Sequence, residues 1–361
     1  MKKHLIISIV LLTVVFGAQA QSKYSNEFLS LGIGARGLAM ANTMCAISDD
    51  VTAAYWNPVG LSRMDKRYQL ALMHAEYFAG VAKYDYAGIG YKIDDRSSVA
   101  LSYIRFGVDN IMNTTELIDA QGNVDYDRIS YFSASDNAFL LSYAYNFEKV
   151  PGLALGANAK IIYRNIGKFA HAWGFGLDFG LQYNHKGWQA GAMLRDGTST
   201  FNAWSYQLTD QIIDVFQQTG NEIPENELEL TLPALMLGAG KYVELGKGFN
   251  ATFALGLDCT FDGKRNTLIK SNVLSVDPHF GMEFAYKKIV ALRAGIGNFQ
   301  QEPDFDGKKR TTLQINLGVG VCIKNIVSID YAFTDLGDIS IAQYSHIISL
   351  KVAIDRFKKQ Q

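Results

Sequence analysis

The stretch TLQINLGVGVCI, residues 312–323, alternates at every position between a large aliphatic residue and a small or polar one. Successive side chains of a β-strand point to opposite faces, so this pattern predicts a strand with one large apolar face and one small face. In a secreted β-sandwich, the alternative fold, the polar face meets water and is normally rich in Lys, Glu and Thr. Glycine and asparagine on the small face therefore favour a membrane β-barrel with a crowded lumen.

The same alternation recurs along the chain, for example over residues 170–183, 249–261 and 327–333. Aromatic residues stand toward the ends of the large faces, as the interfacial girdles of a membrane barrel require. We predict an all-β fold, a 14-stranded antiparallel transmembrane β-barrel of a Gram-negative outer membrane. Its strands are expected near residues 68–77, 84–93, 97–105, 139–147, 153–164, 170–183, 188–195, 230–242, 249–261, 277–286, 290–296, 311–323, 327–333 and 346–354.

Short connections alternate with long ones between these segments, which is typical of bacterial barrels with short periplasmic turns and long outer loops. Residues 184–187 form a short connection, whereas 106–138 and 196–229 form long ones that are the best candidates for binding a partner. An even number of strands then puts both chain ends in the periplasm. Residues 210–218 have the apolar spacing of a short helix, which we expect to pack its loop onto the barrel rim.

The residues that precede the first strand divide into two parts. Residues 1–20 combine a basic start, an apolar run and the triplet Ala18-Gln19-Ala20, which predicts a secretory signal peptide. Residues 21–67 mix apolar residues with glycines ahead of a barrel whose lumen needs filling, and we interpret them as a plug segment. The transmembrane barrel then occupies residues 68–361.

Composition and motifs argue against several classes of function. The formal net charge is −1, so no strongly basic surface is available for nucleic acid. The three cysteines are odd in number and widely spaced, which excludes a disulfide framework and a CxxC metal site. The sequence contains no GxSxG or HExxH motif, so we expect neither an enzyme nor a bound cofactor.

The plug segment carries the most specific motif of the chain. Asn57 and Pro58 are expected to turn the backbone, because Asn bonds its own backbone and Pro fixes φ. The complete motif comprises Gly34, Arg36, Asp49, Asp50, Trp56, Asn57 and Pro58. With Phe28, Leu29 and the rest of the stretches 32–36 and 56–61, it resembles the PorV/PorQ family of the type IX secretion system, within the wider FadL-like outer-membrane superfamily.

The resemblance implies a role in protein export and surface attachment. Members of that family bind the C-terminal sorting domains of secreted cargo and sit against the giant SprA translocon. They pass cargo to an attachment complex that contains the PorU sortase. A protein of this kind would be surrounded by membrane lipids and lipopolysaccharide.

Charged residues on the small faces of the strands are predicted to point into the lumen. Their signs balance, so a structural network that grips the plug is favoured over an ion-conducting path. Arg36 could join this network from the plug. The predicted lumen residues are Lys160, Arg164, Asp178, Asp258, Glu283, Arg293, Asp330 and Lys351.

Two functions remain open from the sequence. The first is a protein-binding component of a secretion machine, which the balanced charges and glycines of the lumen favour. The second is a FadL-type channel for hydrophobic small molecules, which needs an apolar pocket with a few polar anchors. An apolar pocket near Phe28, Leu31 and Trp56 would reverse the preference.

Overall fold

In a computed structural model of the chain, the described residues are 25–117, 123–303, 309–336 and 344–355, and the predicted signal peptide lies outside them. Seventeen strands form one antiparallel sheet. They are β1 Tyr68–Tyr77, β2 Ala82–Lys92, β3 Ser97–Asn113, β4 Ser130–Asn146, β5 Leu153–Ile166, β6 Ala170–His185, β7 Trp188–Arg195, β8 Thr200–Tyr206, β9 Leu228–Thr231, β10 Ala234–Gly246, β11 Phe249–Thr260, β12 Ile269–Lys270, β13 Ser275–Tyr286, β14 Val290–Pro303, β15 Lys309–Ile323, β16 Val327–Leu336 and β17 Ser345–Ile354.

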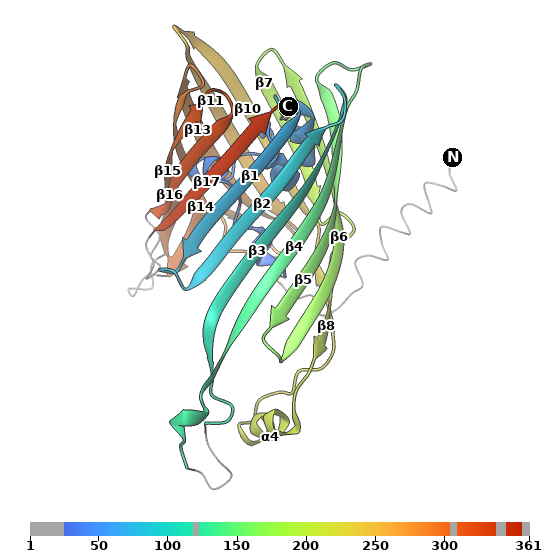
Figure 1. Ribbon diagram of the computed structural model, residues 1–361, viewed down its shortest axis with the longest axis vertical. Coiled ribbons are helices and arrows are strands. Elements are labelled where there is room, and N and C mark those ends of the chain that lie inside the picture. Colours follow the sequence, from blue (N-terminus) through green and yellow to red (C-terminus); the bar gives the residue numbers. More distant parts are fainter. Residues whose placement is uncertain (1–24, 118–122, 304–308, 337–343, 356–361) are drawn as a thin grey trace, which may run out of the picture.

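The sheet closes into a barrel because β1 pairs with both β2 and β17 (Figure 1). β7 and β8 are two pieces of one wall strand, β9 and β10 are two pieces of the next, and β12 is a short addition beside β13. The wall therefore has 14 strands, and the predicted fold class is confirmed.

Helices are few and short in the described residues. Three-residue and six-residue 3₁₀ turns lie at Glu27–Leu29, Tyr126–Arg128 and Pro58–Arg63, and the α-helices are α2 Ala35–Ala39, α3 Ala53–Trp56 and α4 Asp210–Gln218. Within these ranges, no helix is long and apolar enough to cross a bilayer. The helix predicted at 210–218 is confirmed, and its Ile212 is buried at the end of the barrel with the long loops.

The strand bounds differ from the sequence prediction mainly at the long loops. β3 extends to Asn113 and β4 starts at Ser130, so much of the predicted loop 106–138 is a long hairpin that projects beyond the barrel (Figure 1). The predicted loop 196–229 contains β8 and the first residues of β9. A register shift between Val108 and Ile111 interrupts the alternation on β3, and positive φ angles at Asp196 and Ser199 separate β8 from β7. Neither irregularity is visible in the apolar pattern of the sequence.

The two faces of the wall are as the alternation predicts. On β6, Trp173 and Phe175 are 55% and 42% exposed and point outward, whereas Ala172 is fully buried and points inward. Large apolar side chains thus cover the outside, as in a membrane-spanning barrel, and small side chains line the lumen.

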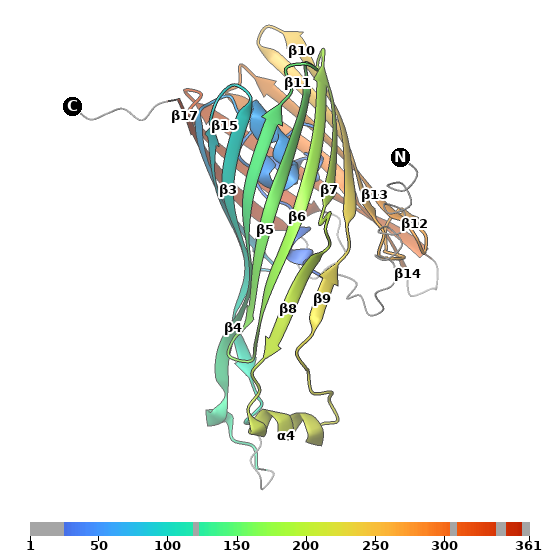
Figure 2. The same ribbon diagram turned by 90° about the vertical axis from the view of Figure 1, so that its right-hand side faces the viewer.

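Residues 25–67 lie inside the barrel, toward the end at which β1 begins and β17 ends (Figure 2). We call residues 25–67 the N-terminal segment, and the end with the short hairpin turns the short-turn end. Glycines of the wall make room for it: a Cβ on Gly191 would lie 2.5 Å from the carbonyl oxygen of Cys45, and one on Gly238 would lie 2.8 Å from the nitrogen of Ala46. The action of this segment as a plug stays a prediction.

This close packing predicts that Gly191→Val destabilises the protein by about 1–3 kcal/mol, the usual effect of overpacking a filled interior. The measurement is the urea concentration at the midpoint of unfolding. Unfolding is monitored by the difference in gel mobility between the folded and the unfolded barrel. Ala190→Val, one residue earlier and on the exposed face, should leave the midpoint unchanged. Equal midpoints for both variants would contradict the packing described here.

Candidate functional site

The Asn57-Pro58 box anchors the N-terminal segment to the strands β6 and β7. The Asn57 Oδ1 accepts from the nitrogen of Val59 at 3.3 Å, and Pro58 starts the 3₁₀ turn that follows. The Asn57 Nδ2 lies within 3.3 Å of the carbonyl oxygens of Leu181 and Ala192. One buried amide therefore forms the turn and holds it against the wall.

Trp56 packs inside the segment itself. A Cβ on Gly37 would lie 2.6 Å from the Trp56 ring, so only glycine leaves space for the indole there. Phe28 and Trp56 belong to the buried core of the segment, and Leu31 packs against it at its edge. These three residues are thus packing residues, and an apolar pocket described below lies at another place in the barrel.

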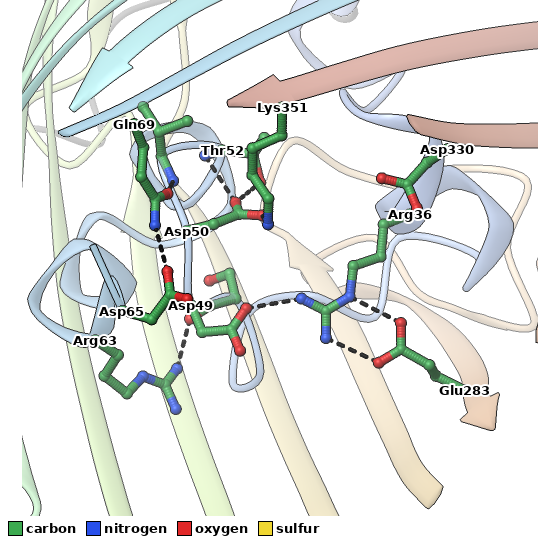
Figure 3. A network of polar contacts seen from close by, with 12 residues as sticks. Arg36, Asp49, Asp50, Thr52, Arg63, Asp65, Gln69, Glu283, Asp330 and Lys351 are labelled. Atoms are coloured by element: carbon green, nitrogen blue, oxygen red, sulfur yellow. Dashed lines mark hydrogen bonds and ion pairs between the residues drawn. The ribbon is translucent and has the colours of Figure 1, made fainter. Parts of the chain in front are cut away.

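Arg36 joins the N-terminal segment to the barrel wall through carboxylates (Figure 3). Its Nε and Nη2 donate to the two oxygens of Glu283 on β13, each at 3.0 Å, and its Nη1 donates to Asp49 at 2.7 Å. Arg293 on β14 donates to the same Glu283 and to Asp330 on β16, each at 2.6 Å. Bidentate guanidinium–carboxylate pairs fix orientation as well as distance, so the segment and three strands share one ionic cluster.

Asp50 makes a second link, to the last strand of the barrel. Its Oδ2 accepts from the Nζ of Lys351 on β17 at 2.7 Å, and its Oδ1 accepts from the nitrogen of Thr52 at 2.9 Å. Burial opposes ionisation, but the charges of Lys351 and Arg36 outweigh it and hold the pKa of Asp50 well below its usual range. The resulting stabilisation is present above about pH 4 and is lost as the pH falls through the lowered pKa.

These ion pairs border a polar cavity of about 370 Å³ at the short-turn end. Arg36, Asp49, Glu283 and Lys351 line its inner part, and Asn325 of the β15–β16 turn lies at its mouth. Charged groups of both signs surround the space, and Arg63 adds a further guanidinium that donates to the carbonyls of the segment. Apolar residues such as Ile47 and Ile326 also line part of it, but with charged groups throughout its lining the cavity suits water or a small polar solute better than a hydrophobic molecule.

Lys160 and Asp178 form a separate buried cluster on β5 and β6. Their Nζ and Oδ1 are 2.8 Å apart, and Lys160 also pairs with Asp196 at the break between β7 and β8. The nitrogen of Asp196 donates to Asp178 at 2.8 Å. Asp196 was not predicted, because it follows an apolar strand and resembles the first residue of a loop. Asn158 donates to both Asp178 and the Ala54 carbonyl, which links this cluster to the segment.

The other two predicted lumen residues have partners on the wall. Arg164 pairs with Asp136 at 2.8 Å and with Glu229 at 3.2 Å, near the long-loop end. Asp258 lies 3.4 Å from the Nε2 of His279. The predicted charges are thus brought together in separate clusters around the lumen, of which those at Arg36, Asp50 and Lys160 contact the segment.

An apolar pocket of about 320 Å³ lies at the long-loop end, between the β3–β4 hairpin, the β5–β6 turn and α4. Phe132 and Phe169 pack edge to face with ring centroids 5.1 Å apart and form one side. Ile212 and Phe216 of α4 form the opposite side, and Tyr206 supplies a hydroxyl. An apolar cavity of about 150 Å³ can hold benzene, so this pocket has room for a small aromatic molecule.

The described residues hold no group of three His, Cys, Asp or Glu side chains arranged to bind a metal ion. Cys45, Cys259 and Cys322 are all free thiols.

No protein-family model matches the sequence, and no curated protein is significantly similar to it. Solved structures are similar. The CymD monoaromatic hydrocarbon channel matches with a TM-score of 0.56 and 12% identity, over 90% of this chain and 98% of that one. The Pseudomonas putida toluene transporter TodX matches with a TM-score of 0.55 and 12% identity, over 90% of this chain and 99% of that one. The Ralstonia pickettii toluene transporter TbuX matches with a TM-score of 0.52 and 13% identity, over 90% of this chain and 98% of that one.

This likeness shows the fold. The expected barrel architecture is confirmed, and the similar structures are described as a hydrocarbon channel and toluene transporters. The narrower resemblance to the PorV/PorQ family finds no support among them.

The ionic cluster predicts that Glu283→Gln loosens the N-terminal segment, because it leaves Arg36 and Arg293 with weaker acceptors. Leaving the buried charges of Arg36 and Arg293 with a weaker acceptor should cost about 1–3 kcal/mol. This corresponds to an increase of roughly tenfold in the population of the loosened state. The readout is the rate at which maleimide labels Cys45, which is buried in the segment, in a Cys259→Ser, Cys322→Ser background. Asp136→Asn, which breaks a lumen pair on the wall, is the control, and equal labelling rates would refute the link.

Proposed function

We propose that this protein is an outer-membrane channel of the FadL type that takes up hydrophobic small molecules, with its short-turn end and both chain ends in the periplasm. The observation that carries the proposal is the apolar pocket between Phe132, Phe169 and α4. It stands where a molecule arriving from outside the cell would first meet the barrel. Nothing about the proposal requires catalysis or a cofactor.

The chemistry of the pocket matches an apolar ligand with at most one polar group. Aromatic and aliphatic side chains surround the space, and Tyr206 with Asn113 and Thr115 at its edge can orient a polar atom. The similar solved structures include a monoaromatic hydrocarbon channel and toluene transporters, which fits a ligand of that size. Passage beyond the pocket would require the N-terminal segment to shift, since ion pairs hold it in the lumen.

The second candidate is a component of the type IX secretion system that binds cargo sorting domains, an SprA-like translocon or the attachment complex with PorU. The observation that favours it is the firm attachment of the N-terminal segment, whose motif carries the resemblance to PorV/PorQ. A barrel that stays filled suits a binding protein better than a channel. The long β3–β4 hairpin, with exposed Tyr126 and Tyr131, would then present contact residues.

The channel proposal predicts that the purified protein binds the neutral fluorophore N-phenyl-1-naphthylamine and that toluene displaces it. Phe216→Ser should weaken binding roughly tenfold or more, because it removes about 1.5–3 kcal/mol of apolar contact. Ile213→Ser, on the same helix but outside the pocket, should bind normally. Identical affinities for both variants, or no displaceable binding, would reject the pocket as a ligand site.

The secretion proposal predicts a different result in a mild-detergent pull-down of the tagged protein from its own outer membrane. Mass spectrometry should identify the giant translocon or secreted proteins that share a C-terminal domain. Recovery of bound apolar small molecules without these proteins would instead favour the channel.

A further inference from the structure

Four hairpin turns at the short-turn end place a lysine in the left-handed backbone conformation. The φ angle is +47° at Lys186, +52° at Lys247, +49° at Lys287 and +53° at Lys324. Turns of this kind favour Gly, which has no Cβ to clash with the backbone at positive φ, and Asn, whose side chain can bond to the local backbone. Lysine therefore stands at all four positions against the backbone preference, which points to a use for its charge.

The four turns are neighbours along one half of the rim. The nitrogen of Tyr242 on β10 donates to the oxygen of Gly187 in the β6–β7 turn at 2.8 Å. The nitrogen of Lys287 donates to the oxygen of Gly248 in the β10–β11 turn at 2.7 Å. Cys322, just before the β15–β16 turn, donates to the β13–β14 turn at 2.7 Å. Backbone hydrogen bonds thus fix the spacing of the four turns.

With Lys288, these lysines form a surface that we call the lysine edge: Lys186, Lys247, Lys287, Lys288 and Lys324. All five are exposed, and none of them makes an ion pair with a carboxylate of the described residues. The four turns contain no Asp or Glu. The turns of the other half differ, because residues 93–96 and 147–152 contain acids and Arg96 pairs with Glu148 at 3.0 Å.

The lysine edge adjoins outward-facing aromatic residues. Trp188, Phe249 and Tyr286 are exposed on the strands next to the turns. The Nζ of Lys287 lies 5.1 Å from the ring centroid of Tyr286, and that of Lys241 lies 4.5 Å from the ring of Trp188. Aromatic girdles of membrane proteins lie at the level of the lipid headgroups. The ammonium groups of Lys287 and Lys241 therefore lie beside outward-facing rings at the level of the membrane surface, whereas Lys288 also lines the polar cavity at this end of the barrel.

We propose that the lysine edge binds anionic phospholipid headgroups of the adjoining leaflet and so gives one half of the barrel a lipid shell enriched in negative charge. Several unpaired ammonium groups at headgroup level attract phosphate and other anionic groups, and hold them more weakly in high salt. In the orientation proposed above this is the periplasmic leaflet. The binding is independent of the molecule that the barrel transports or captures.

The first experiment uses the full mature protein in phosphatidylcholine bilayers with trace spin-labelled lipids. Electron paramagnetic resonance gives the association constant of phosphatidylglycerol relative to phosphatidylcholine at the protein surface. The proposal expects a preference of about threefold or more at low salt that falls toward unity in 1 M salt. Equal association of the two lipids at low salt would overturn it, and this measurement needs no variant.

The second experiment compares two fourfold variants at residues 186, 247, 287 and 324. Lys→Asn suits the left-handed backbone, so the barrel should be at least as stable, but most of the phosphatidylglycerol preference should be lost. Lys→Arg keeps the charge and should retain the preference. Lys92→Asn with Lys149→Asn, on the other half of the rim, should change it little. An undiminished preference in the folded Asn variant would assign lipid binding elsewhere and reject the lysine edge.

Discussion

A 14-stranded barrel encloses more space than its own inward side chains fill, and the remaining structure follows from this excess width. Small inward residues such as Gly191 and Gly238 let the wall approach the backbone of the N-terminal segment. That backbone brings polar groups into a closed space, where each needs a partner. Asn57 and Arg63 supply several of those partners, and the ion pairs of Arg36 and Asp50 hold the segment in place.

The N-terminal segment lies between two different chemical environments along the barrel. The short-turn end holds a polar cavity bordered by paired charges, and the long-loop end holds an apolar pocket bordered by aromatic rings. In the channel proposal, a molecule bound in the outer pocket would reach the inner cavity only if the segment moved, whereas a protein bound to the outer loops would require no such movement.

Much of the wall could be predicted from the sequence, because alternation is a local property of each strand. The alternation of large and small residues predicted the number of strands, and it predicted that Trp173 points outward and Lys160 inward. The alternation did not predict the role of Asp196. The ion pair of Asp196 with Lys160 depends on the break between β7 and β8 and on a strand distant in sequence. The separate clusters around Arg36 and Arg164 were equally hidden, because the sequence does not reveal which inward charges lie opposite one another.

The link between Asp50 and Lys351 has a consequence for assembly. Its two residues stand 301 positions apart, and the second lies on the strand that closes the barrel against β1. The N-terminal segment thus acquires the charge partner of its Asp50 only when the last strand arrives. Contacts this distant in sequence are slow to form, because a long loop must be closed first. Closure of the seam and formation of this ion pair therefore coincide. A chain truncated before β17 would lack both, although the contacts of Asn57 with β6 and β7 and of Arg36 with β13 do not involve that strand.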